Sequence, residues 1–293
     1  MFLRRVVRSP RRRSRGMKRI RPNFAVLSPF SVPGRLGAAV SKKALAWQVK
    51  RAARSMGIRR PLVWVACPPG ASALNGLDPV AVVYQRTDRF EAFANVDREL
   101  IAGYDRTLKA RADLTLFCSR LLHGEEAPHC RAAHFVDPGV DYDVFRRAGD
   151  ERREPAPMAG LPRPRVGFVG GIDIHTFDPD LFVRVAGELS DTCFALVGAC
   201  SLPEEWCTLP NVRFIGRVPY DEVADYMAAC DVLIMPWNNS DWSRACNPVK
   251  LKEYLAIGRP VVSTPFDELE QYPGLVRVAR GAARVVGAQR ALF

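Results

Sequence analysis

The chain has 293 residues, of which 48% are hydrophobic and 25% charged, and its mean hydropathy is −0.09. These values are those of a folded globular protein and exclude a wholly disordered chain. No apolar run approaches the roughly 18 residues that cross a bilayer, which argues against an integral membrane protein. The length suggests two domains of about 150 residues each.

The net charge of +12 comes from 43 basic and 31 acidic residues. Ten of the bases and no acid lie in residues 1–21, so the rest of the chain, with 33 bases and 31 acids, carries only +2. Because like charges repel, residues 1–21 are predicted to form a disordered basic tail. The tail is interpreted as solvated, or as extra residues upstream of a start at Met17. An anionic membrane is its alternative partner, and no specific nucleic acid is expected.

The eight cysteines are spread singly, and with only four histidines they form no zinc-ligand spacing. Reduced thiols are therefore expected, as in a cytosolic protein. The sequence predicts a cytoplasmic location, peripheral at the inner face of the plasma membrane if the tail binds lipid. It requires no metal.

In chain order, short apolar runs alternate with helical patterns. A continuous run such as 80–84 is typical of a parallel strand that is buried on both faces. The predicted strands are 24–27, 62–66, 80–84, 113–117, 133–136, 165–169, 193–197, 212–215, 231–235, 260–263 and 275–278. The predicted helices are 38–56, 97–111, 180–189, 219–229 and 248–256. This alternation indicates an α/β chain with two Rossmann-like domains.

A charged, proline-rich stretch divides the two series of elements. Residues 149–163 have the composition of a linker. The predicted domains are therefore 22–148 and 164–293, with ligands at the carboxyl ends of the strands.

The most informative motif starts at Asn247. Asn247 suits an N-cap, Pro248 the first helical position and Gly258 the helix stop, so free N–H groups would form an anion site. Lys250 and Glu253 share a helix face, with Glu253 about 9 Å along the axis from the cap. On spacing alone, an ordinary capped helix with a surface Lys–Glu pair is the favoured interpretation.

This motif resembles the donor-site helix of GT-B glycosyltransferases, specifically the retaining GT4-like family called glycosyl transferases group 1, of the bacterial polysaccharide and teichuronic-acid type. Further segments from about residue 24 to 280 share the likeness. They are Ala112–Ser119, Pro138–Asp141, Val166–Asp173, Leu209–Tyr220 and Ala229–Pro236.

The resemblance implies transfer of a sugar from a nucleotide-diphosphate sugar to a glycan or lipid-linked acceptor, with retention of configuration and without a cofactor. It implies that Glu253 holds the donor ribose. The other donor-binding residues that it implies are Gly170, Gly171, Asp173, Arg217, Val218, Asn247, Pro248, Val249 and Lys250. Gly170 and Gly171 could equally form a plain strand-to-helix turn, and Arg217 could be a surface loop residue.

The chain departs from the family pattern in several places. Ala245 stands where the motif has its first glutamate, and His175 lies in a loop that usually carries Arg and Lys. The first strand–loop–helix of the amino-terminal domain and the carboxyl-terminal closing helices are expected to be missing. The alternative function is therefore an inactive or truncated remnant that binds a nucleotide or a partner protein.

Asp88 follows the strand at 80–84 and is the candidate catalytic carboxylate, with a turn or cap residue as the alternative. A metal-dependent GT-A enzyme is a weaker alternative. Its Asp-x-Asp motif matches 141–143 and 178–180, but Asp178-Pro179 also fits a helix cap.

Overall fold

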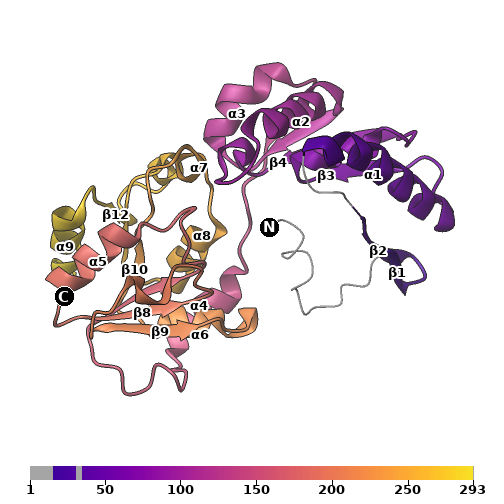
Figure 1. The fold of residues 1–293 in the computed structure, drawn as a ribbon. Helices are drawn as coiled ribbons and strands as arrows, with labels where there is room; N and C mark the ends of the chain where they lie inside the picture. The colour runs from indigo at the N-terminus through magenta and orange to yellow at the C-terminus, as the bar shows by residue number, and fades with distance from the viewer. Residues whose placement is uncertain (1–15, 31–34, 293) are drawn as a thin grey trace. The chain divides into compact units, whose positions relative to one another are not determined.

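The computed structural model describes residues 16–30 and 35–292, which form two compact units. The first unit holds the residues up to Arg86 together with Glu99–Leu116 and Pro128–Ala133. The second holds Thr87–Arg98, Phe117–Ala127 and the chain from His134 onward. Figure 1 labels many of their elements.

The first unit is built on a four-stranded sheet in the order β3-β4-β5-β6. The strands are β3 (Leu62–Val65), β4 (Ala81–Arg86), β5 (Leu114–Phe117) and β6 (Ala133–Phe135), of which β5 and β6 end in the second unit. Helices α1 (Arg35–Ser55) and α2 (Arg98–Arg111) precede β3 and β5. Leu74, Tyr84 and Leu108 lie at the centre of its core.

Part of the predicted disordered tail is ordered. Gly16–Arg21 forms strand β1, which pairs antiparallel with β2 (Phe24–Ser28). Pro22 and Asn23 connect the two strands, and both residue types favour turns. Residues 1–15 of the predicted tail lie outside the described residues.

The second unit contains a six-stranded sheet whose paired strands are all parallel. The order is β12-β11-β10-β7-β8-β9, which is the dinucleotide-binding Rossmann order. The strands are β7 (Arg165–Val169), β8 (Cys193–Val197), β9 (Val212–Gly216), β10 (Val232–Met235), β11 (Val261–Ser263) and β12 (Val276–Val278). The strand order reverses between β7 and β10, so a ligand crevice is expected at their carboxyl ends.

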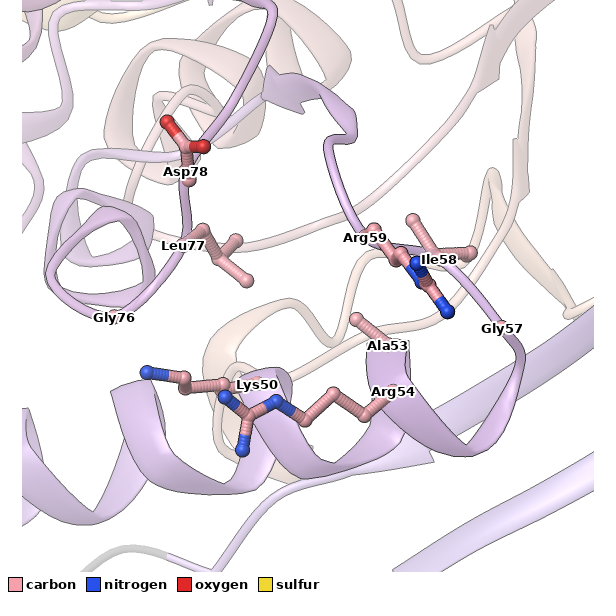
Figure 2. Close-up of a pocket in the computed structure, with 9 residues that line it drawn as sticks. All are labelled: Lys50, Ala53, Arg54, Gly57, Ile58, Arg59, Gly76, Leu77 and Asp78. Carbon is pink, nitrogen blue, oxygen red and sulfur yellow. The ribbon is translucent and has the colours of Figure 1, made fainter.

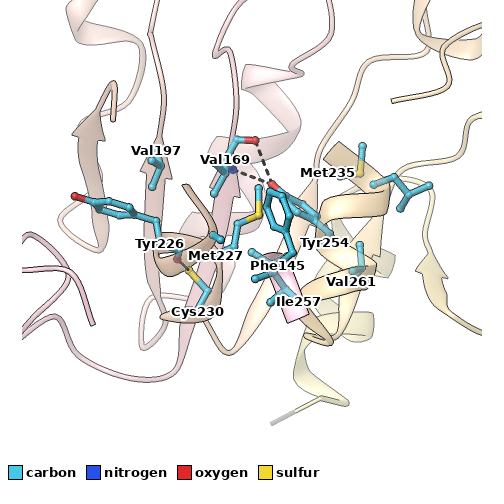
Figure 3. Close-up of a cluster of buried hydrophobic side chains, with 14 of the residues drawn as sticks. Phe145, Val169, Val197, Tyr226, Met227, Cys230, Met235, Tyr254, Ile257 and Val261 are labelled. Atoms are coloured by element: carbon cyan, nitrogen blue, oxygen red, sulfur yellow. Dashed lines mark hydrogen bonds between the residues drawn. The ribbon is translucent and has the colours of Figure 1, made fainter. Parts of the chain in front are cut away.

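Helices cover both faces of this sheet. Helices α5 (Pro179–Glu188) and α9 (Ala282–Arg290) pack over Phe168, Leu196 and Ile234. Helices α4 (Tyr142–Glu151), α6 (Val223–Ala228) and α8 (Val249–Ile257) pack on the other face, against Val169 and Val197 (Figure 3). Because side chains alternate along each strand, neighbouring apolar residues supply both cores. The predicted α/β architecture is therefore confirmed.

Several short elements were not predicted. They are α3 (Arg120–Glu126), α4, α7 (Asp241–Arg244) and α9, with 3-10 turns at Pro68–Leu74, Phe90–Ala92, Ala127–His129, Glu204–Trp206 and Asp267–Gln271. None of the helices between residues 16 and 292 is long and apolar enough to cross a membrane, the gap at 31–34 aside.

Helix α4 changes the predicted division of the chain. It extends into the proposed linker at 149–163 and packs against α8 and α6. Phe145 and Ala148 are buried in the same core as α8. At Gly149 a Cβ atom would lie 2.2 Å from the carbonyl oxygen of Ile257, so glycine permits this close approach. Residues 134–163 thus group with the second unit.

Candidate functional site

The candidate site lies at the carboxyl end of β7, where Gly170 follows the strand with φ of +149°. A Cβ atom at Gly170 would lie 2.0 Å from Nζ of Lys250, so the ammonium occupies the space that glycine leaves. At Gly198, which follows β8, a Cβ atom would lie 1.9 Å from the carbonyl oxygen of Gly170. Close packing against backbone therefore requires glycine at 198, whereas at 170 it is the positive φ that favours glycine.

The ammonium of Lys250 lies in this crevice without a neutralising carboxylate among the described residues. Its Nζ lies 4.2 Å from the ring centroid of Phe168 and 5.9 Å from that of Trp237. Burial lowers the pKa of Lys250 to about 8, although the charges of Glu253 and Asp173 act in the opposite direction. Within residues 16–30 and 35–292, no carboxylate lies within ion-pair distance of this ammonium. An anionic ligand would supply the missing partner.

The helix that carries Lys250 starts one residue later than predicted. Helix α8 begins at Val249 with Pro248 as its N-cap, and Asn247 is not the cap. Proline has no side chain that can cap, so no side chain satisfies the first N–H groups in the described part of the chain. This N-terminus retains the predicted capacity for an anion.

Asn247 has a different role from the predicted one. Its Nδ2 donates to Oδ1 of Asp137 at 2.9 Å, and its Oδ1 accepts from Nζ of Lys252 at 3.0 Å. Lys252 also pairs with Asp137 at 2.9 Å and donates to the hydroxyl of Tyr272 at 2.8 Å. This network fixes the chain just before α8.

Glu253 lies one turn beyond Lys250 and is 8% exposed. Its Oε1 accepts a hydrogen bond of 3.0 Å from the hydroxyl of Tyr220. Burial raises the pKa of Glu253, while the Tyr220 hydrogen bond and the Lys250 charge partly offset this. Oε2 has no hydrogen-bond donor among the residues described, so the carboxylate can accept from a ligand hydroxyl.

Tyr254 connects α8 to the end of β7, a role that the sequence did not reveal. Its buried hydroxyl accepts from the N–H of Val169 at 2.8 Å and lies 3.4 Å from the carbonyl oxygen of the same residue (Figure 3). Val169 immediately precedes Gly170. The helix and the glycine loop are thereby held in register.

Asp88 lies beside the residues that lead into α8. Its Oδ1 accepts a hydrogen bond from the thiol of Cys246 at 3.8 Å. Burial, followed by the Asp88 charge, raises the pKa of that thiol, which keeps it protonated as a donor. Both residues belong to the second unit.

Three ring nitrogen atoms of the second unit are buried without hydrogen-bond partners in the part of the chain that the structure describes. They are Nδ1 of His175, Nε1 of Trp237 and Nε1 of Trp242. The rings of His175 and Trp242 contact Phe93 with centroids 5.6 and 5.0 Å away. Unpaired buried donors are costly, so such groups suit a polar ligand.

The remaining predicted residues are distributed around the loops. Asp173 accepts from the backbone N–H of His175 at 2.9 Å, which shapes the loop after Gly171. Val218 packs on the core, whereas Arg217 is exposed and forms no hydrogen bond or ion pair with the other site residues in the described chain. Two residues on, Tyr220 joins this segment to Glu253.

The positions that differ from the predicted motifs are also explained by their surroundings. Ala245 is buried, with 1% exposure, and brings no carboxylate to the crevice. Asp141 and Asp178 cap α4 and α5 by accepting from the N–H groups of Val144 and Leu181. The two Asp-x-Asp matches therefore contribute helix caps.

The comparison with protein families addresses the same region. Residues 163–284 match the model described as glycosyl transferases group 1. The carboxyl-terminal part of the chain is therefore similar to this family.

The chain is also similar to a curated protein of Bacillus subtilis (strain 168). TuaH, named as a glycosyltransferase of teichuronic acid biosynthesis, is 30% identical over 224 residues. The match covers 70% of this chain and 55% of TuaH, so the chain spans about half the length of that relative.

Solved glycosyltransferases share the fold. Sucrose-phosphate synthase from Thermosynechococcus elongatus superposes with a TM-score of 0.70 at 13% identity, over 96% of this chain and 77% of that one. Anabaena HepE in complex with UDP-glucose gives a TM-score of 0.66 at 15% identity, over 88% and 73% of the two chains. The predicted GT-B resemblance is confirmed at the level of family and fold.

Proposed function

We propose that the chain transfers a sugar from a nucleoside-diphosphate sugar to a hydroxyl of a glycan or lipid-linked acceptor. The observation that carries this proposal is the placement of the Lys250 ammonium against Gly170, with Glu253 one helical turn farther along α8. Retention of configuration is what the family resemblance implies.

The cation and the helix N-terminus suit the diphosphate. Lys250 has no carboxylate within ion-pair distance in the described residues, and the first N–H groups of α8 lack a side-chain cap there. Together they would stabilise the negative charge that develops on the leaving nucleoside diphosphate. Gly170 and Gly171 would let the phosphates approach the backbone.

The other groups suit the sugars of the donor. Glu253 would accept hydrogen bonds from ribose hydroxyls, and the unpartnered Nε1 of Trp237 would donate to the transferred sugar. Arg217 and Val218 would border the base. UDP and UDP-glucose are bound by the structural neighbour HepE, which supports a nucleotide sugar as the donor.

Asp88 is proposed as the carboxylate on the acceptor side. It would accept a hydrogen bond from the attacking hydroxyl, and the Cys246 thiol would hold its orientation. An Asp88→Asn variant would then bind nucleotide normally but transfer no sugar.

The proposal is tested by measuring UDP and GDP binding to the full chain by calorimetry. Glu253→Gln keeps the size of the side chain but removes the charge, and should weaken binding about 10- to 100-fold, because hydrogen bonds to charged groups contribute about 1.5–3 kcal/mol. Glu188→Gln at the exposed end of α5 is the matched control and should bind as the wild type does. If neither UDP nor GDP binds, the proposal is wrong.

Ala245 favours a second candidate, a protein that binds nucleotide without transferring sugar. The buried alanine offers no carboxylate where the family motif has its first glutamate. In that case UDP or GDP would bind, Glu253→Gln would weaken binding, and no nucleoside diphosphate would be released from a range of nucleotide sugars with or without acceptor.

A further inference from the structure

The positive charge of the chain extends well beyond the tail at residues 1–21. Residues 1–77 contain 18 of the 43 basic residues and none of the 31 acidic ones. The remaining 25 bases and 31 acids give residues 78–293 a net charge of −6. The positive charge is therefore carried by folded elements of the first unit as well as by the tail.

Helix α1 presents one exposed face that combines cations with an aromatic ring. Lys43, Trp47, Arg51 and Arg54 recur at helical spacing and are exposed. Trp47 is 62% exposed, and the guanidinium of Arg51 lies 5.6 Å from its ring centroid. Exposed tryptophan beside cations is the pattern of an interfacial anchor.

The β1–β2 hairpin extends this basic and apolar surface. Ile20, Phe24 and Val26 are between 46% and 51% exposed, and Lys18 pairs across the strands with Val26. On the hairpin, the guanidinium of Arg19 donates to the carbonyl oxygen of Ser55 at 3.3 Å. This bond attaches the hairpin to the end of α1.

A cavity of about 720 Å³ lies beside the same face of α1. Lys50 and Arg54 border it from the helix, and Arg59 borders it from the following loop (Figure 2). Its one acidic residue, Asp78, is paired with Arg60 at 3.4 Å. In the described residues, none of the three bordering cations has an ion-pair partner, so the cavity suits an anionic headgroup.

We propose that this face of the first unit is a docking surface for an anionic lipid bilayer. It consists of the exposed residues of α1, the β1–β2 hairpin and the cavity at Lys50, Arg54 and Arg59. The cations would bind lipid phosphates, while Trp47 and the hairpin side chains would enter the headgroup layer. Exposed aliphatic residues favour a bilayer over a nucleic acid, because bases are bound by aromatic stacking. The proposal is independent of the nucleotide site.

The test compares two charge-matched variants of the full chain in sedimentation with vesicles. The surface variant carries Lys43→Gln, Arg51→Gln and Arg54→Gln, and the tail variant carries Arg11→Gln, Arg12→Gln and Arg13→Gln. On vesicles of phosphatidylcholine mixed with phosphatidylglycerol, the surface variant should bind about 100-fold more weakly than wild type, at about 1 kcal/mol for each basic residue near the membrane. The tail variant should lose much less, and pure phosphatidylcholine should bind none of them.

A second variant tests the apolar part of the surface. Trp47→Ala should weaken vesicle binding about 10-fold by removing buried apolar area. Nucleotide binding and thermal unfolding, measured on every variant, should match wild type and so separate docking from folding. Equal losses in the surface and tail variants, or tighter binding to a mixed-sequence RNA than to the anionic vesicles at the same salt, would overturn the proposal.

Discussion

Lys250 and Glu253 lie three residues apart on α8, and burial shifts their pKa values in opposite directions. It lowers the pKa of the lysine to about 8 and raises that of the glutamate. Both shifts have one cause, because a low-dielectric site disfavours the charged form of either group. A ligand that supplies hydrogen bonds and counter-charge would therefore stabilise the charged forms of both side chains.

The pKa of Lys250 predicts a pH dependence of nucleotide binding. The protonated amine attracts the diphosphate and the neutral amine does not, so affinity should fall as the pH rises through about 8. Calorimetry with UDP or GDP between neutral and alkaline pH would measure this fall.

Lys250→Gln provides the comparison for that measurement. It should bind nucleotide more weakly than wild type at neutral pH, with an affinity that hardly changes over the same range. If the variant loses affinity with rising pH as steeply as wild type, the lysine is not the group that titrates.

For single residues, the sequence predicts which of them lie at the site better than it predicts their hydrogen-bond partners. Asn247 and Pro248 indicate a helix start, but side-chain rules alone could not show that Asn247 bonds Asp137, which lies 110 residues away. The helical spacing of Tyr254 indicates only that it can face the core. Its bond to Val169 depends on the packing of α8 on β7, which no local pattern encodes.

Helices α4 and α8 approach each other so closely that α4 needs a glycine, Gly149, at the point of contact. Gly149→Ala would place a methyl group 2.2 Å from the carbonyl oxygen of Ile257. Forced contacts of this kind cost about 1–3 kcal/mol, so the free energy of unfolding should fall by that amount in urea titrations.

Gly187→Ala in α5 is the matched helical control. Nothing lies within 4 Å of the position that its Cβ would occupy. It should leave stability unchanged or raise it by up to about 1 kcal/mol, because alanine is the better helix former. Equal destabilisation by both variants would mean that the α4–α8 contact is not tight.

The predicted and the missed elements differ in how they bury their side chains. Strands β7 and β8 are buried throughout, and their unbroken apolar runs predicted them to the residue. Helix α4 buries only Phe145 and Ala148 among charged neighbours, so its sequence resembles a linker. Strand β1 is exposed along its length and therefore lacks any apolar pattern.

For the molecule as a whole, the grouping of residues 134–163 with the second unit can be tested with fragments. A fragment that begins at His134 retains Phe145 and Met158, which are 2% and 0% exposed, whereas one that begins at Pro164 loses both. Full burial of each such side chain contributes about 1.5–3 kcal/mol. The shorter fragment should therefore be less stable by about 3 kcal/mol or more in urea unfolding.

Fragments of equal stability would instead support a boundary at the proline-rich stretch. The sequence placed the boundary there because proline and charge are typical of linkers. The sequence could not show contacts between distant segments, such as the packing of α4 on α8.

The space above Gly170 is occupied by the end of a side chain that lies 80 residues later in the chain. A methyl group at position 170 and the ammonium of Lys250 in its present place would occupy the same volume. A side chain at position 170 would therefore have to displace the ammonium, and at a φ of +149° it would also strain the backbone. The dependence runs one way, because a shorter side chain at position 250 would need no change at position 170.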